Sequence, residues 1–83
     1  MPSEEFNKAA ASVRALTTKP EDSVMLELYG LYKQVTVGDC NIAEPAAGDS
    51  IARAKWEAWN RNKGKAVGDA EKQYITKASQ LTG

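Results

Sequence analysis

Two tyrosines and two lysines in this chain could together hold a ligand that carries a flat ring and phosphate groups. Tyr29 and Tyr32 lie three residues apart, so a helix would place them on one face, and Lys33 follows the second tyrosine. Lys55 comes from a separate segment that also holds two tryptophans. Aromatic rings stack on a base, and ammonium groups pair with phosphate oxygens. The pattern therefore indicates a nucleotide-like ligand, although each lysine taken alone could simply extend over the rim of an apolar core.

The sequence offers few groups for catalysis or metal binding. It contains no histidine, which is the commonest general base near neutral pH and the commonest metal ligand. Its single cysteine, Cys40, would need a lysine or a carboxylate to activate it, which is uncommon. The acids Asp39, Glu44 and Asp49 lack the spacing of a calcium-binding loop and are typical of turns and helix caps. We therefore expect no enzyme activity, no catalytic residue, no metal site and no cofactor, with a Cys40 thioesterase as a distant alternative.

Length and charge restrict the class of protein further. Residues 1–83 are expected to form a single domain with a thin core, so a shallow groove is expected rather than a deep cavity. The 11 Lys and Arg residues balance the 11 Asp and Glu residues, which argues against nucleic acid as the main partner. The chain shows neither a signal-peptide pattern nor an apolar run of membrane-spanning length, and a lone cysteine forms no internal disulfide. These features predict a cytoplasmic protein.

Apolar periodicity and capping residues predict two helices in the first half of the chain. The first helix follows Ser3 as its N-cap and ends within residues 17–20. The second begins at residues 20–22, where a proline and two acids suit a first turn. It has two apolar faces, one for a core and one that carries Met25 beside the two tyrosines, so a ligand could cover the second face. Residues 37–48 then form an unusually long loop.

Two further helices are predicted in the second half. The third starts after Asp49 or Ser50 and reaches about Asn62, with its tryptophans expected in the core. The fourth is expected to be capped by Gly68 or Asp69. This order predicts an all-α protein, a four-helix bundle with one long crossover loop between the second and third helices.

At this point the chain resembles the acyl-CoA-binding protein family. The resemblance extends from about Phe6 to Leu81 and rests mainly on two runs. One is Tyr-x-x-Tyr-Lys-Gln-x-Thr-x-Gly-Asp at Tyr29–Asp39, and the other is Ala-Lys-Trp-x-Ala-Trp at Ala54–Trp59. The resemblance implies an up-down-down-up order of the four helices around one long-chain acyl-CoA.

The resemblance also implies a role for particular residues. Tyr32 would stack on the adenine, while Lys33, Lys55 and the Tyr29 hydroxyl would hold the 3′-phosphate of CoA. Tyr74 would contact the ligand from the last helix. The ligand-binding set that follows from the resemblance is Arg14, Lys19, Met25, Leu26, Tyr29, Tyr32, Lys33, Ala54, Lys55 and Tyr74.

Within that set, Arg14 would add a cation from the first helix, and Met25, Leu26 and Ala54 would line a groove for the acyl chain. Residues 44–52 depart from the pattern usual in the family: Ile51 stands where a ligand-contacting lysine is usual, Ser50 is small, and Glu44 reverses a charge. We expect these changes to affect affinity and chain preference more than the class of function.

The resemblance implies that the chain binds medium- to long-chain acyl-CoA esters one-to-one. It would then act as a monomeric intracellular carrier and buffer in lipid metabolism, with transient membrane contact and delivery to acyl-CoA-using enzymes. The alternative is a helical protein-interaction or signalling module that uses the same aromatic face.

Overall fold

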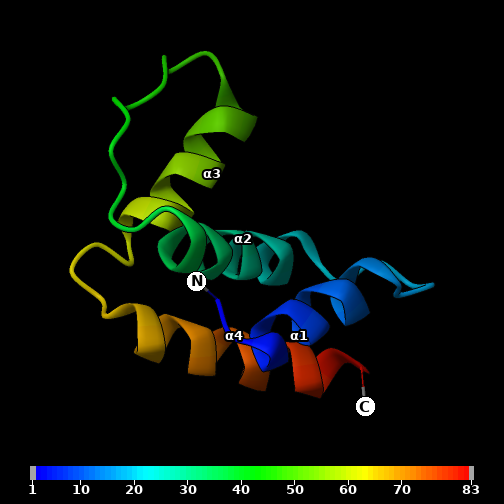
Figure 1. Cartoon of the computed structure of the whole chain (residues 1–83). Helices are drawn as coiled ribbons and strands as arrows, with labels where there is room; N and C mark the ends of the chain where they lie inside the picture. The colour runs from blue at the N-terminus through cyan, green and yellow to red at the C-terminus, as the bar shows by residue number, and fades with distance from the viewer. Residues whose placement is uncertain (1, 83) are drawn as a thin grey trace.

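The computed structural model describes residues 2–82, and these form four helices and no strand. The helices are α1 (Glu4–Arg14), α2 (Asp22–Thr36), α3 (Ser50–Asn60) and α4 (Val67–Thr82), coloured from blue to red in Figure 1. The all-α class and the long crossover between α2 and α3 are thereby confirmed.

Side-chain caps start two of these helices. The Ser3 hydroxyl accepts a hydrogen bond from the backbone N–H of Phe6 at 3.1 Å, and the Asp49 carboxylate accepts one from the N–H of Ala52 at 3.1 Å. Each satisfies a backbone donor that the first turn leaves unpaired. The predicted cap of α4 is wrong, because the helix already begins at Val67, before Gly68 and Asp69. The backbone carbonyl of Ala66, just before α4, accepts the first helical hydrogen bond, which the Ala70 N–H donates. This start of the helix needs no side-chain cap.

Glycines with positive φ follow the ends of α2 and α3. Gly38 has φ +108° and Gly64 has φ +86°, a region that other residues rarely adopt. At Gly38 the chain leaves α2 for the crossover loop, and at Gly64 it turns from α3 toward α4 (Figure 1). Both glycines therefore let the chain change direction after a helix has ended.

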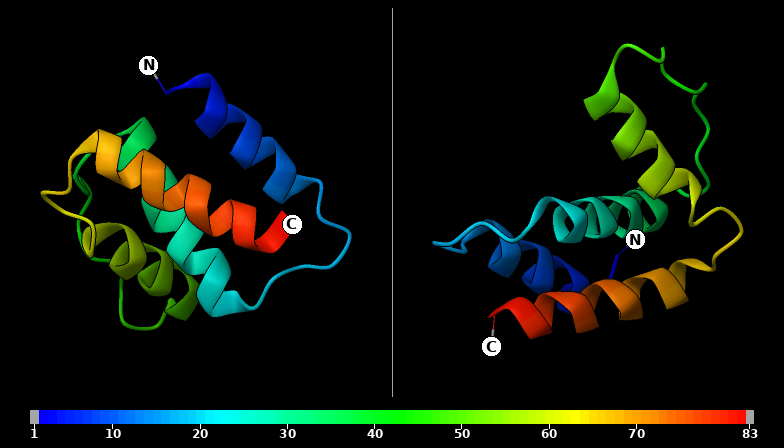
Figure 2. Two further views of the ribbon diagram at one scale, coloured as in Figure 1. Left: turned by 90° about the horizontal axis from the view of Figure 1, so that it is seen from below. Right: turned by 180° about the vertical axis from the view of Figure 1, so that it is seen from behind.

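Contacts between helices establish their directions. The ion pair of Glu27 with Lys77 at 3.1 Å, together with the bond from the Gln34 side chain to the Lys65 carbonyl, shows that α2 and α4 run antiparallel. Ser3 bonds to Glu71 near the starts of α1 and α4, which run parallel, as the left view of Figure 2 shows. The up-down-down-up order implied by the resemblance is confirmed.

The core lies where α4 packs against both α1 and α2, whereas α3 packs against α2 alone. Apolar side chains of α1, α2 and α4 fill it, and they are nearly excluded from solvent. At 25 cal/mol per Å² of apolar surface, such burial is the main stabilising contribution in a domain of this size. The core consists of Phe6, Ala10, Leu28, Leu31, Val35, Ala70, Tyr74 and Ala78.

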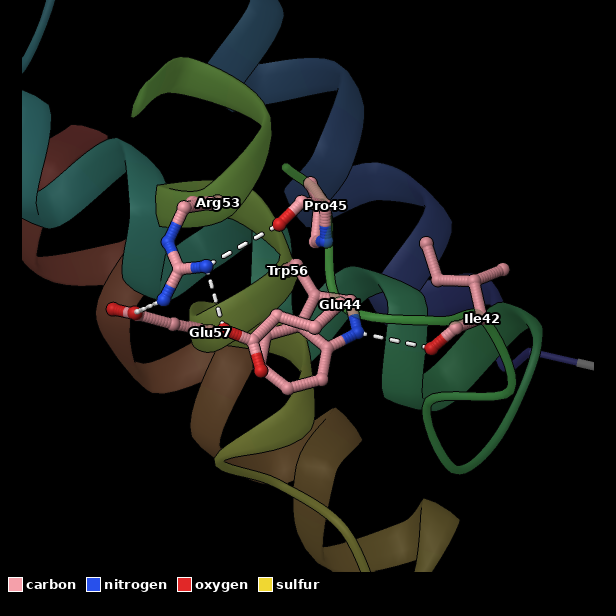
Figure 3. A network of polar contacts seen from close by, with 6 residues as sticks. All are labelled: Ile42, Glu44, Pro45, Arg53, Trp56 and Glu57. Carbon is pink, nitrogen blue, oxygen red and sulfur yellow. Dashed lines mark hydrogen bonds and ion pairs between the residues drawn. The ribbon is translucent and has the colours of Figure 1, made fainter. Parts of the chain in front are cut away.

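The crossover loop is attached to the outer side of α3 by polar contacts (Figure 3). Arg53 pairs with Glu44 at 2.5 Å and donates to the Pro45 carbonyl at 3.2 Å. The Trp56 indole N–H donates to the Ile42 carbonyl at 3.0 Å, so this half-buried ring lies under the loop. The prediction that Trp56 packs in the core is wrong, because its ring lies on the loop side of α3 and stays half-buried. Trp59 is buried as predicted.

Candidate functional site

Gly30 of α2 lies close against the backbone of Ala58 in α3. A Cβ built on Gly30 would lie 2.2 Å from the Ala58 carbonyl oxygen, so only glycine permits this spacing. The Lys55 ammonium lies 5.7 Å from the centre of the Tyr29 ring, and both residues precede the Gly30–Ala58 contact along their helices. The two helices therefore run parallel, meet near Gly30 and diverge toward their N-termini, as α2 and α3 do in Figure 1.

A groove of about 610 Å³ occupies the space where α2 and α3 diverge. Its walls carry apolar side chains of Met25 and Leu26 from α2 and of Ile51 and Ala54 from α3. Charged and polar side chains border the same space. The remaining lining residues are Lys19, Asp22, Tyr29, Ser50 and Lys55.

A second pocket of about 310 Å³ lies beside the groove, among α1, α2 and α4. Arg14 reaches it from α1, Tyr32 from α2 and Tyr74 from α4. Met25 and Tyr29 line both spaces, so the pocket and the groove adjoin. The combined site offers an apolar trough at one end and aromatic rings with a guanidinium group at the other.

Tyr32 and Tyr74 line the second pocket and pack against the buried ring of Phe6, which does not line it. The Phe6 ring stacks on Tyr32 with centroids 5.6 Å apart, and it lies tilted against Tyr74 at 4.9 Å. Burial raises the pKa of the Tyr74 hydroxyl; the charge of Arg14 opposes this rise and Tyr32 adds to it. Tyr74 therefore stays a neutral hydroxyl near pH 7, while Tyr32 is half-buried and retains an open side.

Nine of the ten ligand-binding residues proposed from the sequence line one of these two spaces. Lys33 lines neither. Its ammonium lies 5.0 Å from the centre of the Trp59 ring, an arrangement that attracts a cation to the ring face. The structure thus brings Lys55, Lys19 and Arg14 to the site and directs Lys33 toward a buried tryptophan.

Comparison with known proteins decides the family. A family model described as acyl CoA binding protein matches residues 3–78. This chain belongs to the acyl-CoA-binding protein family.

Named relatives and solved structures agree with this assignment. An acyl-CoA-binding protein homolog from Drosophila melanogaster is 50% identical over 76 residues, or 92% of this chain and 88% of the relative. The acyl-CoA-binding protein of Saccharomyces cerevisiae is 48% identical over 81 residues, or 98% and 93%. The crystal structure of Oryza sativa acyl-CoA-binding protein 2 has a TM-score of 0.88 at 40% identity, covering 94% of this chain and 87% of that one. The solution structure of the yeast protein has a TM-score of 0.77 at 48% identity, covering 95% and 92%.

In this member of the acyl-CoA-binding protein family, part of the Tyr29–Asp39 motif serves the fold. Gln34 is only 2% exposed, and its amide N–H groups donate to the Asp39 carboxylate and to the Lys65 carbonyl, each at 2.9 Å. The same Asp39 oxygen accepts from the Gly64 N–H at 2.8 Å. These bonds join the end of α2 to the turn before α4. This structural role was not predicted from the sequence, where the Gln-x-Thr-x-Gly-Asp spacing is its only trace.

Asp39 makes the stability of this junction depend on pH. The hydrogen bond from Gln34 and then that from Gly64 lower the pKa of Asp39 below its usual 3.8. Desolvation opposes them, and the charge of Lys63 adds a smaller lowering. A lowered folded-state pKa means that the stabilisation is present above pH 3.8 and is lost as the pH falls through the folded-state value. We expect the melting temperature to fall over that acid range more steeply than in Asp39→Asn, which keeps an acceptor oxygen without the charge. Parallel melting curves for the two proteins across the range would contradict this role of Asp39.

Glu44 of the crossover loop has an ion-pair partner in this chain. Its ion pair with Arg53 forms part of the attachment of the crossover loop to α3. Both side chains are substantially exposed, so the pair contributes little stability by itself. The charge of Glu44 is therefore matched by Arg53 within the protein, and Glu44 does not line the groove.

The described part of the chain, residues 2–82, contains no group of three or more His, Cys, Asp or Glu side chains that could hold a metal ion. None of its helices is long and apolar enough to cross a bilayer. Cys40 lies half-buried in the crossover loop and lines neither the groove nor the second pocket.

Proposed function

We propose that this protein binds one medium- to long-chain acyl-CoA ester and serves as its carrier and buffer in lipid metabolism. The proposal rests on one observation: the apolar groove and the aromatic pocket adjoin, because Met25 and Tyr29 line both. An apolar groove next to an aromatic and cationic pocket matches a ligand with a hydrocarbon chain at one end and a phosphorylated nucleotide at the other. The named relatives support the same ligand class.

In this proposal the acyl chain lies in the groove between α2 and α3, against Leu26, Met25 and Ala54. The adenine stacks on the open side of Tyr32, with Tyr74 beside it. Lys55 and the Tyr29 hydroxyl hold the 3′-phosphate at the junction of the two spaces, and Arg14 and Lys19 add cations at either side. Lys33 joins them after leaving the ring of Trp59.

The two parts of the ligand contribute differently. Burying about ten methylene groups stabilises the complex by roughly 8 kcal/mol before the costs of association, at about 0.8 kcal/mol each. A hydrogen bond to a charged group contributes roughly 1.5–3 kcal/mol. The acyl chain of the ligand therefore supplies most of the affinity, and the phosphate contacts select CoA esters over free fatty acids. Binding of this kind only stabilises the ground state, so the proposal includes no chemical step.

Isothermal titration with palmitoyl-CoA tests the proposal, with the ester of dephospho-CoA and free palmitate as comparators. We expect tight one-to-one binding of palmitoyl-CoA, weaker binding without the 3′-phosphate, and none of palmitate. A melting temperature that does not rise with palmitoyl-CoA would contradict any binding to the folded state. That result would favour the alternative, a protein-interaction module that uses the aromatic face.

Removing the Lys55 ammonium is expected to weaken palmitoyl-CoA binding by about 10- to 100-fold, because a charge-assisted bond to phosphate is lost. Lys33→Ala is expected to weaken binding less, because Lys33 must give up its contact with Trp59 before it can reach a phosphate. Titration of both variants checks the order of these effects. Lys72→Ala is the matched control, since Lys72 lies on α4 outside both spaces. Unchanged affinity in Lys55→Ala would refute the phosphate assignment.

The carrier role extends to the setting in which the protein works. We expect residues 1–83 to act as one domain and as a monomer in the cytoplasm. Uptake and delivery of the ligand would involve transient contact with membranes and with acyl-CoA-using enzymes. Sedimentation with and without palmitoyl-CoA would test the monomeric state.

A further inference from the structure

One apolar side chain on the groove wall stands out by its exposure. Ile51 is 71% exposed, the most of any exposed large apolar side chain in residues 2–82, yet it lines the groove together with Leu26 and Ala54. Single exposed apolar residues are common on protein surfaces. An exposed isoleucine that continues an apolar trough differs from these, because a ligand in the trough would cover it.

The register of α2 and α3 places Ile51 at the open end of the groove. Lys55 faces Tyr29 near the closed end, where the groove adjoins the aromatic pocket. Ile51 precedes Lys55 by one helical turn, about 6 Å along the axis of α3, toward the end where the two helices have diverged. Along the groove, Ile51 therefore lies farther from Tyr29 and the aromatic pocket than Ala54 does.

We propose that Ile51 is the residue that sets the preference for acyl-chain length, by covering the distal methylenes of long chains. This inference rests on the proposed function and adds a specificity determinant to it. A short acyl chain would end before Ile51 and leave its side chain exposed. A long acyl chain would bury the Ile51 side chain, so affinity would continue to rise with each added methylene group. With a polar residue at this position, the added methylene groups would no longer raise the affinity.

The charges around Ile51 favour an acyl chain over an anionic lipid surface as the occupant. Lys19 and Lys55 border the groove, but Asp22 lines it too and Asp49 caps α3 directly before Ser50. Two positive and two negative groups leave no local excess charge to attract anionic headgroups. The apolar continuity with Leu26 and Ala54 is the dominant property of this end of the groove.

The test compares affinities for hexanoyl-, dodecanoyl- and palmitoyl-CoA in wild type and Ile51→Ser, by titration in vesicle-free buffer. We expect Ile51→Ser to weaken palmitoyl-CoA by about tenfold and to leave hexanoyl-CoA within about twofold. Ile51→Leu should retain the wild-type series, because it keeps the apolar surface. Val67→Ser is the control for losing an exposed apolar side chain, since Val67 is 46% exposed and lines neither space. Circular dichroism confirms that each variant is folded.

An equal loss of affinity at all three chain lengths would overturn the inference, since it would place Ile51 at the head group. Unchanged affinity at every length would also overturn it. If Ile51→Ser then took up palmitoyl-CoA more slowly from vesicles of anionic phospholipid, Ile51 would belong to a membrane-contacting surface instead. Failure of the wild type to bind any acyl-CoA is a separate result, which would overturn the proposed function and the inference with it.

Discussion

Replacing Phe6 with alanine is expected to destabilise this protein by about 3–5 kcal/mol. The Phe6 side chain is 1% exposed and contacts both Tyr32 and Tyr74, so its removal leaves a cavity at the meeting point of three helices. Each kcal/mol corresponds to roughly 4–8 °C in melting temperature for a domain of this size. Thermal unfolding followed by circular dichroism would measure the loss.

Phe6→Leu serves as the matched control for this experiment. It keeps an apolar side chain in the core while removing the ring contacts, and we expect it to cost less than about 1.5 kcal/mol. Comparable losses in the two variants would show that the rings, and not the filled volume, determine the stability. A loss below about 1 kcal/mol in Phe6→Ala would contradict the central place of Phe6 in the core.

Gly30→Ala is expected to lower stability by up to about 2 kcal/mol, although alanine is the better helix former. A Cβ at this position would lie 2.2 Å from the carbonyl oxygen and 2.6 Å from the carbonyl carbon of Ala58, and these backbone atoms move only if α3 moves. Overpacking of this kind costs roughly 1–3 kcal/mol or more, against a gain of about 1 kcal/mol in helix propensity. Urea unfolding would measure the net effect.

Gly68→Ala is the control, because Gly68 also lies in a helix but nothing approaches its Cβ position within 4 Å. Only the gain in helix propensity acts there, so this variant should be as stable as the wild type or slightly more stable. Equal behaviour of the two variants would refute the close packing at Gly30. Because Gly30 lies where the groove closes, Gly30→Ala should also alter palmitoyl-CoA affinity, whereas Gly68→Ala should not.

Several features of this protein were determined by the sequence alone. Ser3 and Asp49 cap helices through bonds to backbone groups three residues away, so each cap is visible in a short stretch of sequence. Gly64 marks the turn after α3, also for a local reason, because its positive φ favours glycine. The two long motifs were specific enough to identify the family, and with it the order of the helices, because whole runs of residues are shared.

Other features were decided only by the tertiary structure. Gln34 and its partner Asp39 lie in one recognised motif, but the second bond of the Gln34 amide goes to the Lys65 carbonyl in the distant turn before α4. Lys33 and Lys55 look equivalent in the sequence, yet one ammonium faces Trp59 and the other faces Tyr29 at the groove.

Ile51 shows the same limit of the sequence. The helical period places it on one face with Ala54, yet it is 71% exposed because α3 diverges from α2 at that end. Caps and turns act within a few residues and can therefore be predicted locally. The contact of a side chain with a distant segment depends on how the helices pack, which residues such as Gly30 set through a single close approach.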